Sequence, residues 1–307
     1  FVAERLSLSA TNMFIDSFLG YLKVERHYSA HTLRAYENDL LAFKEYVARL
    51  DESLSFLEAD ADVVRSWVAS MMDEGAAPAS VCRRLSALRS FFSYLRANCG
   101  VQENPVSNLR GPKCRKKLPS FVKEEDMNTL IDKISFGEGY EACRDKMILQ
   151  MFYETGVRLS ELVGMNVASV DMQADVIKVL GKRNRERIIP FASGLKRALV
   201  VYLAEREAFA QSTDGALFLS KRGGRINPGS VYRMVNKRLT GVTSVKKKSP
   251  HVLRHSFATA MLNNNAEIGA VKELLGHRQL ATTEIYTHLS FEDLKGFYEK
   301  AHPRAGK

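Results

Sequence analysis

The first hundred residues carry apolar side chains at helical spacing and lack the alternation typical of strands. Ser29 stands directly before the second apolar stretch, where its hydroxyl can cap a helix N-terminus. The pattern predicts four helices that bury their stripes against one another as a small bundle. The predicted core positions are Met13, Phe14, Phe18 and Leu22; Leu33, Tyr36, Leu40, Phe43 and Val47; Val64, Trp67, Val68 and Met71; and Val81, Leu85, Leu88, Phe92 and Leu95.

From residue 120 onward, helical and strand-like stretches alternate. Residues 176–180 and 187–189 are rich in aliphatic side chains and flank a basic turn at 181–185, which predicts a β-hairpin with a cationic tip. The fold class expected is mainly α, with a four-helix N-terminal domain and a mostly helical second domain that contains a small antiparallel β-hairpin. Helices are predicted in the second domain at about 123–134, 140–154, 158–165, 193–210, 227–240, 250–264, 267–275 and 291–300.

Length and composition exclude several classes of protein. A chain of 307 residues with 45% hydrophobic and 26% charged side chains is typical of about two folded globular domains. No apolar run approaches the ~20 residues of a membrane-spanning helix, and we expect no secretory leader. The four cysteines lack C-x-x-C spacing, so we expect neither a disulfide scaffold nor a zinc module, and a reducing cytoplasm as the location.

The net charge of +10 is unevenly distributed along the chain. Residues 1–109 hold 11 basic and 14 acidic side chains, whereas residues 110–307 hold 34 basic and 21 acidic ones. Residues 110–117 contain five basic side chains and no acidic one, and nearby prolines favour an extended chain. We therefore divide the chain into a helical domain at 1–109, a basic linker at 110–119 and a second domain at 120–307. The linker could follow a phosphate backbone, or it could be an ordinary solvated connection.

The first domain is acidic overall, but its fourth predicted helix is basic. Its cations could grip a polyanion by that helix alone, and Thr32 and Arg34 open the second helix beside it. A merely solvated face remains the alternative. The candidate contacts of the first domain and linker are Thr32, Arg34, Arg83, Arg84, Arg89, Lys113, Arg115, Lys116 and Lys117.

Two motifs of the second domain place cations at helix starts. In Ser249-Pro250-His251-Val252-Leu253-Arg254-His255, the Ser and Pro favour a helix start, and His251 and Arg254 share one face. A helix N-terminus with a guanidinium suits a phosphate group, and His251 can move a proton near neutral pH. In Glu154-Thr155-Gly156-Val157-Arg158-Leu159-Ser160-Glu161-Leu162, Glu161 can orient Arg158 for bidentate phosphate contact. Ordinary structural roles are the alternative for each motif taken alone.

Two further segments add candidate groups. Lys182 stands at the predicted hairpin tip, flanked by Arg183 and Arg185, where it could reach a DNA groove and deliver a proton. In Leu274-Leu275-Gly276-His277-Arg278, Gly276 is typical of a helix C-cap and exposes His277 just beyond the helix. Tyr286 follows nine residues later, and its phenol needs activation to act as a nucleophile because its usual pKa is about 10.

Arg158, Lys182, His251, Arg254, His277 and Tyr286, in this order, resemble the tyrosine recombinase (phage integrase) family, and most closely its short Xer-type members. The resemblance covers nearly the whole chain. It includes a Ser29, Thr32, Tyr36, Asp39-Leu40 pattern in a helical, SAM-like DNA-clamping domain and the closing His302-Pro303-Arg304-Ala305. The hairpin tip, Gly181-Lys182-Arg183-Asn184-Arg185, departs slightly, because related proteins often have Gly at its third place and Lys at its fifth.

The resemblance implies that Tyr286 attacks a scissile phosphate, which gives a 3′-phosphotyrosine and a free 5′-hydroxyl. It implies that Arg158 and Arg254 grip the non-bridging oxygens, His251 acts as base and Lys182 as acid, His277 adds a hydrogen bond, and Glu161 holds Arg158. No cofactor and no metal are expected, because two Arg and one Lys supply the positive charge. A metal pair of His251 and His255 is the alternative, disfavoured by the cation of Arg254.

The resemblance also implies a partner and an assembly. The partner is double-stranded DNA with an inverted-repeat recombination site, resolved through a Holliday junction by a homotetramer or a heterotetramer with a paralogue. A C-terminal helix near 291–300 would dock into a neighbouring subunit, or pack on its own domain. The task would be chromosome-dimer resolution or mobile-element integration, in the cytoplasm at the nucleoid. The alternatives are a type IB topoisomerase and a non-enzymatic DNA-binding protein.

Overall fold

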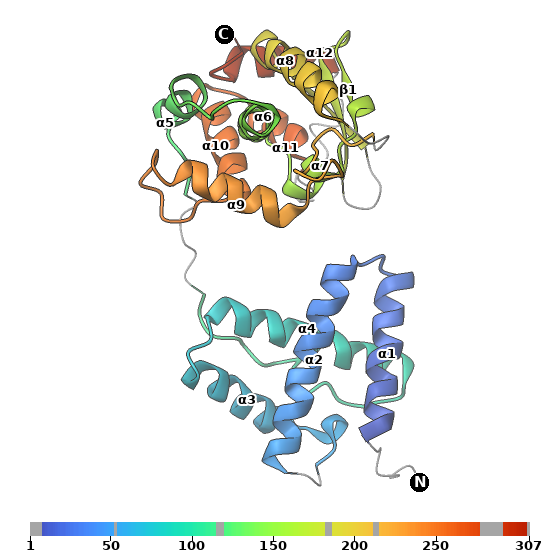
Figure 1. Cartoon of the computed structure of the whole chain (residues 1–307). Coiled ribbons are helices and arrows are strands. Elements are labelled where there is room, and N and C mark those ends of the chain that lie inside the picture. Colours follow the sequence, from blue (N-terminus) through green and yellow to red (C-terminus); the bar gives the residue numbers. More distant parts are fainter. Residues whose placement is uncertain are drawn as a thin grey trace. The chain divides into compact units, whose positions relative to one another are not determined.

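The computed structural model describes residues 8–51, 54–114, 120–181, 186–210, 215–276 and 291–305. The chain divides into two compact units, residues 1–117 and 118–307, each with its own hydrophobic core (Figure 1). The division falls within the stretch 110–119. No helix in the described part of the chain is long and apolar enough to cross a membrane.

The first unit contains the four predicted helices. They are α1 (Leu8–Val24), α2 (Ala30–Leu50), α3 (Ala61–Asp73) and α4 (Pro78–Asn98), with a short 3-10 turn, η1 (Phe56–Glu58), between α2 and α3. The Ser29 hydroxyl accepts the backbone N–H of Thr32 at 3.3 Å, so the predicted cap of α2 is present. Because α4 starts at a proline, which cannot donate a backbone hydrogen bond, its N-terminus forms without loss of an internal bond.

Aromatic side chains fill the core of the first unit. Phe43 lies at the centre, with its ring centroid 4.8 Å from that of Trp67 and 5.3 Å from that of Phe56. One predicted core position is wrong, because Met13 is 61% exposed and Ile15 is buried instead. Helical spacing allows either side of α1 to be the apolar face, and packing against α2 and α4 selects the face that carries Ile15.

The segment after α4 packs back along that helix. Arg89 donates from Nε to the Val106 carbonyl oxygen at 3.1 Å and from Nη2 to that of Leu109 at 2.8 Å. Further along, the Sγ atoms of Cys82 and Cys114 lie 3.4 Å apart as free thiols. The described half of the basic linker therefore follows the surface of α4.

The second unit consists of helices around one buried central helix. Figure 1 shows α6 end-on in the middle of this unit, and twelve of its residues are buried, including Phe152 and Tyr153. The predicted helices are present within a few residues of their expected bounds: α5 (Glu124–Asn128) continued by a π-helical turn η2 (Thr129–Lys133), α6 (Tyr140–Thr155), α7 (Leu159–Gly164), α8 (Ser193–Phe209), α9 (Pro228–Leu239), α10 (Pro250–Asn263), α11 (Ile268–Leu275) and α12 (Phe291–Ala301).

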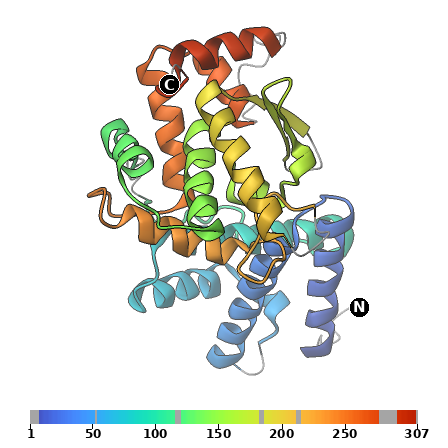
Figure 2. The ribbon, with the colours of Figure 1, turned by 45° about the horizontal axis from the view of Figure 1, so that its top comes forward.

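A small antiparallel sheet stands beside these helices (Figure 2). The predicted hairpin is present as β2 (Val176–Leu180) and β3 (Glu186–Pro190), paired with Ile177 opposite Ile189. A two-residue strand β1 (Val170–Asp171) adds to β2 and was not predicted, since two residues show no alternation. The fold class, mainly α with a small antiparallel sheet, is confirmed. β3 contacts α11 and α12, which brings the hairpin next to the end of α11.

Candidate active site

Arg158 and Glu161 form an ion pair at the start of α7. Arg158 donates from Nη1 to Glu161 Oε1 at 2.7 Å, and its backbone N–H donates to Oε2 at 2.8 Å. The three-residue spacing that suggested this pair thus holds in the structure. Burial would raise the pKa of Glu161, but hydrogen bonds from Arg187 and Arg158 outweigh it and lower the pKa to about 2. The carboxylate is therefore ionised at any working pH.

Gly156 makes the sharp turn between α6 and α7. Its φ is +60°, a conformation that glycine adopts without strain, and it ends α6 as a left-handed C-cap. A Cβ here would lie 2.5 Å from Phe257 Cδ1 and 2.9 Å from Leu275 Cδ2. No side chain fits this place, so α6, α10 and α11 approach one another closely next to Arg158.

α10 begins at Ser249-Pro250 as predicted and carries His251 and Arg254. Arg254 is buried and donates from Nη1 to the Gly156 carbonyl oxygen and from Nη2 to that of Leu275. Burial, and then the nearby charge of Arg158, lower the pKa of Arg254 to about 10, so its guanidinium stays charged near neutral pH.

His251 is exposed, one helical turn before Arg254. Partial burial lowers its pKa from the usual 6.5, and the positive charges of His255, Arg254, Lys247 and Arg158 lower it further. An imidazole with a lowered pKa is neutral at physiological pH, which is the state that can accept a proton.

The C-terminal end of α11 is the point where the arginines converge. Its last three carbonyl groups belong to consecutive residues. The Leu275 carbonyl accepts from Arg254, and the Gly276 carbonyl accepts from Arg158 Nη2 at 2.9 Å. The third, that of Leu274, accepts from Arg187 Nε at 3.1 Å. Gly276 ends the helix with φ +61°, as its sequence context predicted.

Arg187 is a further residue of the site that was not among the predicted ones. It lies on β3, and its Nη1 and Nη2 donate to the two oxygens of Glu161 at 2.7 and 2.8 Å. The available signal was its position in a predicted strand just after the basic hairpin tip. Nothing local indicates that it meets a carboxylate 26 residues earlier in the chain.

Several predicted residues lie outside the described part of the chain. They are Lys182, Arg183 and Arg185 of the hairpin tip, His277 and Tyr286 after α11, and Arg115, Lys116 and Lys117 of the linker. Along the chain, Lys182 precedes β3 by four residues and His277 directly follows Gly276. Three of the six predicted catalytic residues, Arg158, His251 and Arg254, are described, and these three lie together.

The candidate DNA-contacting side chains of the first unit differ in whether they already have partners within the protein. Arg34 and Lys113 are exposed, and the Thr32 hydroxyl lies 2.9 Å from that of Ser29. Asp39, which is buried, forms an ion pair with Arg83, and its Oδ1 lies 3.8 Å from Arg84 Nε. Burial raises the pKa of Asp39, an effect that Arg83 and Arg84 oppose. Arg89 holds the segment 106–109 and so has a structural contact of its own.

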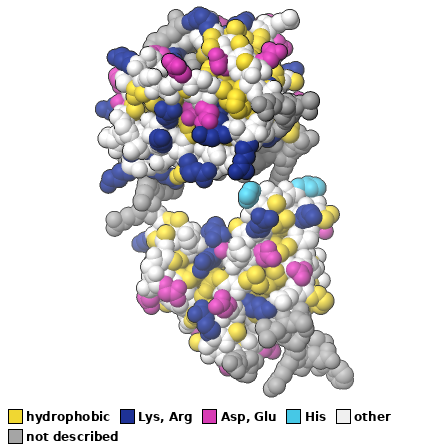
Figure 3. Space-filling view, in the orientation of Figure 1, with side chains coloured by type: hydrophobic (Ala, Val, Ile, Leu, Met, Phe, Trp, Pro, Cys, Tyr) yellow, Lys and Arg dark blue, Asp and Glu magenta, His cyan; other side chains and the backbone are white. Residues whose placement is uncertain are grey.

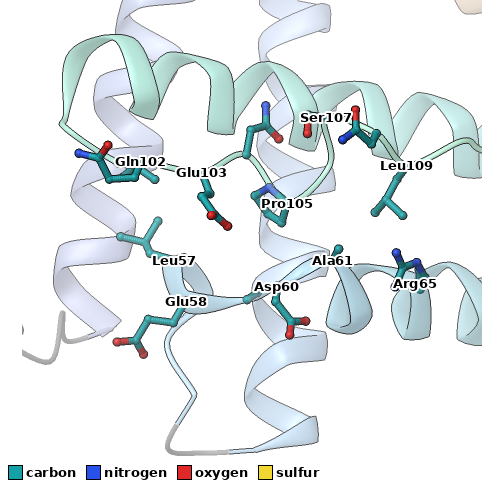
Figure 4. A pocket seen from close by; sticks show the side chains of 14 residues that line it. Leu57, Glu58, Asp60, Ala61, Arg65, Gln102, Glu103, Pro105, Ser107 and Leu109 are labelled. Atoms are coloured by element: carbon teal, nitrogen blue, oxygen red, sulfur yellow. The ribbon is translucent and has the colours of Figure 1, made fainter.

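The first unit also has an open cleft of about 490 Å³ (Figure 4). It lies between the start of α3 and the segment 101–109. Glu58, Asp60 and Glu103 line it together with Arg65, so the charge of its lining is acidic overall, which disfavours a phosphate backbone.

The second unit shows many cations on its surface. In Figure 3, Lys and Arg side chains (dark blue) line the lower rim of this unit as drawn. Among the described residues, no three or more His, Cys, Asp or Glu side chains gather in a way that could hold a metal ion. Within the described ranges, three guanidinium groups and one carboxylate meet at the end of α11.

Comparison with known proteins gives matches to both units. Residues 120–293 match the Phage integrase family, and residues 15–98 match the Phage integrase N-terminal SAM-like domain. Tyrosine recombinase XerC of Pelotomaculum thermopropionicum is 37% identical over 301 residues, which cover 95% of this chain and 98% of that protein. Tyrosine recombinase XerC of Azotobacter vinelandii is 39% identical over 293 residues, with 95% and 96% coverage.

Solved structures agree with this fold. XerH site-specific recombinase bound to a palindromic difH substrate in a post-cleavage complex aligns with a TM-score of 0.74 at 22% identity, over 97% of each chain. The same recombinase in a pre-cleavage complex with difH aligns with a TM-score of 0.67 at 25% identity, over 92% of this chain and 83% of the other. The chain belongs to the tyrosine recombinase (phage integrase) family and is an Xer-type site-specific DNA recombinase.

Proposed function

We propose that Arg158, Arg254 and His251, together with Lys182, His277 and Tyr286, cleave and rejoin DNA at one phosphate. The Tyr286 phenol oxygen forms a bond to the scissile phosphorus and passes its proton to His251. The bond to the 5′-oxygen breaks, and that oxygen takes a proton from Lys182 and leaves as a hydroxyl. The product is a 3′-phosphotyrosine, and the reverse attack by a 5′-hydroxyl of another strand rejoins the DNA.

One observation carries this assignment. Arg158 and Arg254 come from segments about 100 residues apart, yet both donate to neighbouring carbonyls at the end of α11. The chain continues from that point to His277 and Tyr286. Two guanidinium groups beside the entry to the nucleophile segment can stabilise the additional negative charge that develops on the oxygens of a five-coordinate phosphorus.

The electrostatics of the site support the proposed roles. Arg254, with a pKa of about 10, keeps its charge in the pH range in which His251, with its lowered pKa, is neutral. The site therefore presents two cations and one free base at neutral pH. A bound phosphodiester adds a negative charge, which favours the protonated form of His251 as Tyr286 gives up its proton.

The substrate is double-stranded DNA with an inverted-repeat site, and the assembly is a homotetramer or a heterotetramer with a paralogue. XerH recombinase, which shares the fold, is bound to a palindromic DNA substrate in its post-cleavage complex, and this supports the inverted-repeat site. The XerC names of the relatives favour chromosome-dimer resolution, at the nucleoid in the cytoplasm. DNA contacts from Arg34, Arg83, Arg84 and Lys113, each with an exposed or half-exposed side chain, would anchor the clamp domain.

Subunit exchange through α12 requires that this helix leave its own domain. In the single chain, α12 contacts α10 and α11, and its Tyr298 side chain is fully buried. The His302 ring stacks on Tyr298 with centroids 5.1 Å apart. Docking into a neighbour would replace these contacts with equivalent ones on the next subunit.

A suicide DNA substrate, nicked so that the cleaved strand end diffuses away, tests the proposed chemistry. The wild-type protein should accumulate a covalent adduct, and Tyr286→Phe should form none while binding the same DNA. Tyr232→Phe is a matched control, because Tyr232 is an exposed tyrosine on α9. An adduct that persists in Tyr286→Phe would assign the nucleophile elsewhere, and relaxation of plasmids without a recombination site would favour the topoisomerase alternative.

A further inference from the structure

The Arg187 side chain is largely buried and forms hydrogen bonds within the protein. Its side chain is 13% exposed, and each of its three nitrogens donates a hydrogen bond. The two Nη atoms form a fork on the carboxylate of Glu161, and Nε reaches the Leu274 carbonyl oxygen. Bidentate pairing of this kind fixes both the position and the plane of the carboxylate.

The Glu161 carboxylate connects Arg187 to Arg158. Oε1 accepts from Arg187 Nη1 and Arg158 Nη1, and Oε2 accepts from Arg187 Nη2 and the Arg158 backbone N–H. The Glu161 side chain is only 2% exposed, so its oxygens depend on protein donors rather than on bulk water. Without Arg187, half of the donors that orient this carboxylate are lost, and the guanidinium of Arg158 loses its fixed support.

Arg187 also supports the end of α11. Its contact with the Leu274 carbonyl stands next to those of Arg254 and Arg158 with Leu275 and Gly276. A Cβ on Gly276 would lie 3.2 Å from Arg187 Cδ, so the guanidinium stem packs directly against the C-cap. Arg187 therefore touches both the support of Arg158 and the start of the segment that carries His277 and Tyr286.

We propose that Arg187 is a positioning residue of strand cleavage, which orients Arg158 through Glu161 and holds the end of α11 without touching DNA. This inference rests on the proposed function. A direct grip on the phosphate is disfavoured, since all three nitrogens have protein partners. A role in stability alone is the competing explanation, because a buried ion pair is also costly to break.

The experiment measures single-turnover cleavage of the suicide substrate by Arg187→Met and Arg187→Lys. Lys keeps the charge but cannot bond both carboxylate oxygens and the Leu274 carbonyl at once. We expect cleavage about 100-fold slower in each variant, the loss typical of a small misplacement of a reacting group. The dissociation constant for DNA should change by less than about twofold, since no DNA contact is removed.

Arg206→Met is the matched control. Arg206 belongs to the same unit and donates to the carbonyls of Ala216 and Leu217, far along the chain from the site residues. The Arg206→Met variant should cleave the suicide substrate at the wild-type rate. If Arg187→Met does not fold, Arg187→Lys, which retains the charge opposite Glu161, supplies the measurement.

A methylphosphonate at the scissile position separates positioning from stability. Replacing one non-bridging oxygen by methyl removes the negative charge that Arg158 is proposed to neutralise. If Arg187 acts through Arg158, the deficit of its variants should shrink from about 100-fold to less than about 10-fold on this substrate. An equal deficit on both substrates, or wild-type cleavage by Arg187→Met, would overturn the inference.

The results of these experiments distinguish the positioning role of Arg187 from the proposed function on which it rests. Wild-type protein that forms no adduct on the phosphodiester refutes the proposed function, and the inference falls with it. A wild-type adduct that depends on Arg158, combined with normal cleavage by the Arg187 variants, refutes only the positioning role.

Discussion

Arg304, near the C-terminus, joins the last residues of the chain to the central helix of the second unit. It donates from Nε to Glu154 Oε1 at 3.1 Å and from Nη1 and Nη2 to the two oxygens of Asp132 at 2.9 Å each. Glu154 is completely buried in α6, and the Arg304 side chain is 8% exposed. Arg304→Met keeps an unbranched apolar stem but removes the only charge bonded to Glu154 in the described structure.

The expected cost comes from the carboxylate left behind. Breaking a buried ion pair from one side destabilises a protein by about 3–5 kcal/mol, because the remaining charge is neither solvated nor paired. The other carboxylate paired with Arg304 is that of Asp132, whose side chain is 41% exposed. Asp132→Asn should therefore lower the free energy of unfolding by only about 0–1 kcal/mol. Glu154→Gln in the Arg304→Met background should restore most of the loss, since no buried charge remains.

The loss of stability in Arg304→Met should be larger at high pH than at low pH. Burial raises the pKa of Glu154 above 4.5, an effect that Arg304 partly opposes. A carboxyl whose pKa is higher in the folded chain than in the unfolded one lowers stability as pH rises above the unfolded value. Arg304→Met removes the opposing charge and raises this pKa further. Its destabilisation should therefore be larger at pH 8 than at pH 5, where Glu154 can hold its proton.

Urea unfolding of the full chain, followed by two signals, provides the measurement. Trp67 is the only tryptophan and lies buried in the first unit, so its fluorescence reports that unit alone. Circular dichroism reports the helices of both units. In Arg304→Met the dichroism transition of the second unit should move down by roughly 1–2 M urea, with the Trp67 transition unchanged. A loss below 1 kcal/mol, or one equal at pH 5 and pH 8, would refute the reasoning.

Three other predictions follow from the site and the charge distribution. Gly156→Ala should destabilise the second unit by about 2–4 kcal/mol, because the residue must keep φ near +60° and its new Cβ would meet Phe257. The same urea measurement checks this, and an unchanged unfolding transition would show that α10 can move away. The second-order rate constant for cleavage, which reports the DNA-free protein, should rise with pH and level off below pH 6.5, because His251 must be neutral to act as base and its pKa is lowered in the absence of DNA. His251→Asn should remove this rise, and a profile unchanged in that variant would exclude His251 as the base. DNA affinity should fall steeply as the salt concentration rises, because residues 110–307 hold 34 basic and 21 acidic side chains. The plot of log K against log salt concentration should be linear, and a flat plot would contradict phosphate contacts as the source of affinity.

Local signals in the sequence predicted most of the elements. Apolar spacing located the α-helices that the structure describes in the second unit within a few residues, and the aliphatic runs around 181–185 located the hairpin. Gly276 was identified as a cap residue, and its φ is positive. These features depend on a few neighbouring residues, whose conformational preferences act whatever the rest of the chain does. Where the choice of helix face depended on the partner helices, as for Met13 and Ile15, the prediction failed.

The sequence by itself also determined which residues are candidates for the chemistry. Arg158, His251 and Arg254 were identified from their motifs, and Glu161 was paired with Arg158 within the same motif. In the structure Arg158 is the N-cap of α7 and Glu161 is the third residue of that helix, so the carboxylate reaches back to the Arg158 backbone N–H.

Only the tertiary structure decided what the arginines bind. Arg187 meets Glu161, Arg254 meets the carbonyls of Gly156 and Leu275, and Arg304 meets Glu154, at separations of 21 to 150 residues. The ends of α6 and α11 are brought together by the packing of buried side chains such as Phe257, and their carbonyls have no helical partner of their own. Guanidinium groups satisfy them because burial makes an unpaired carbonyl costly, and that cost arises only once the core has formed.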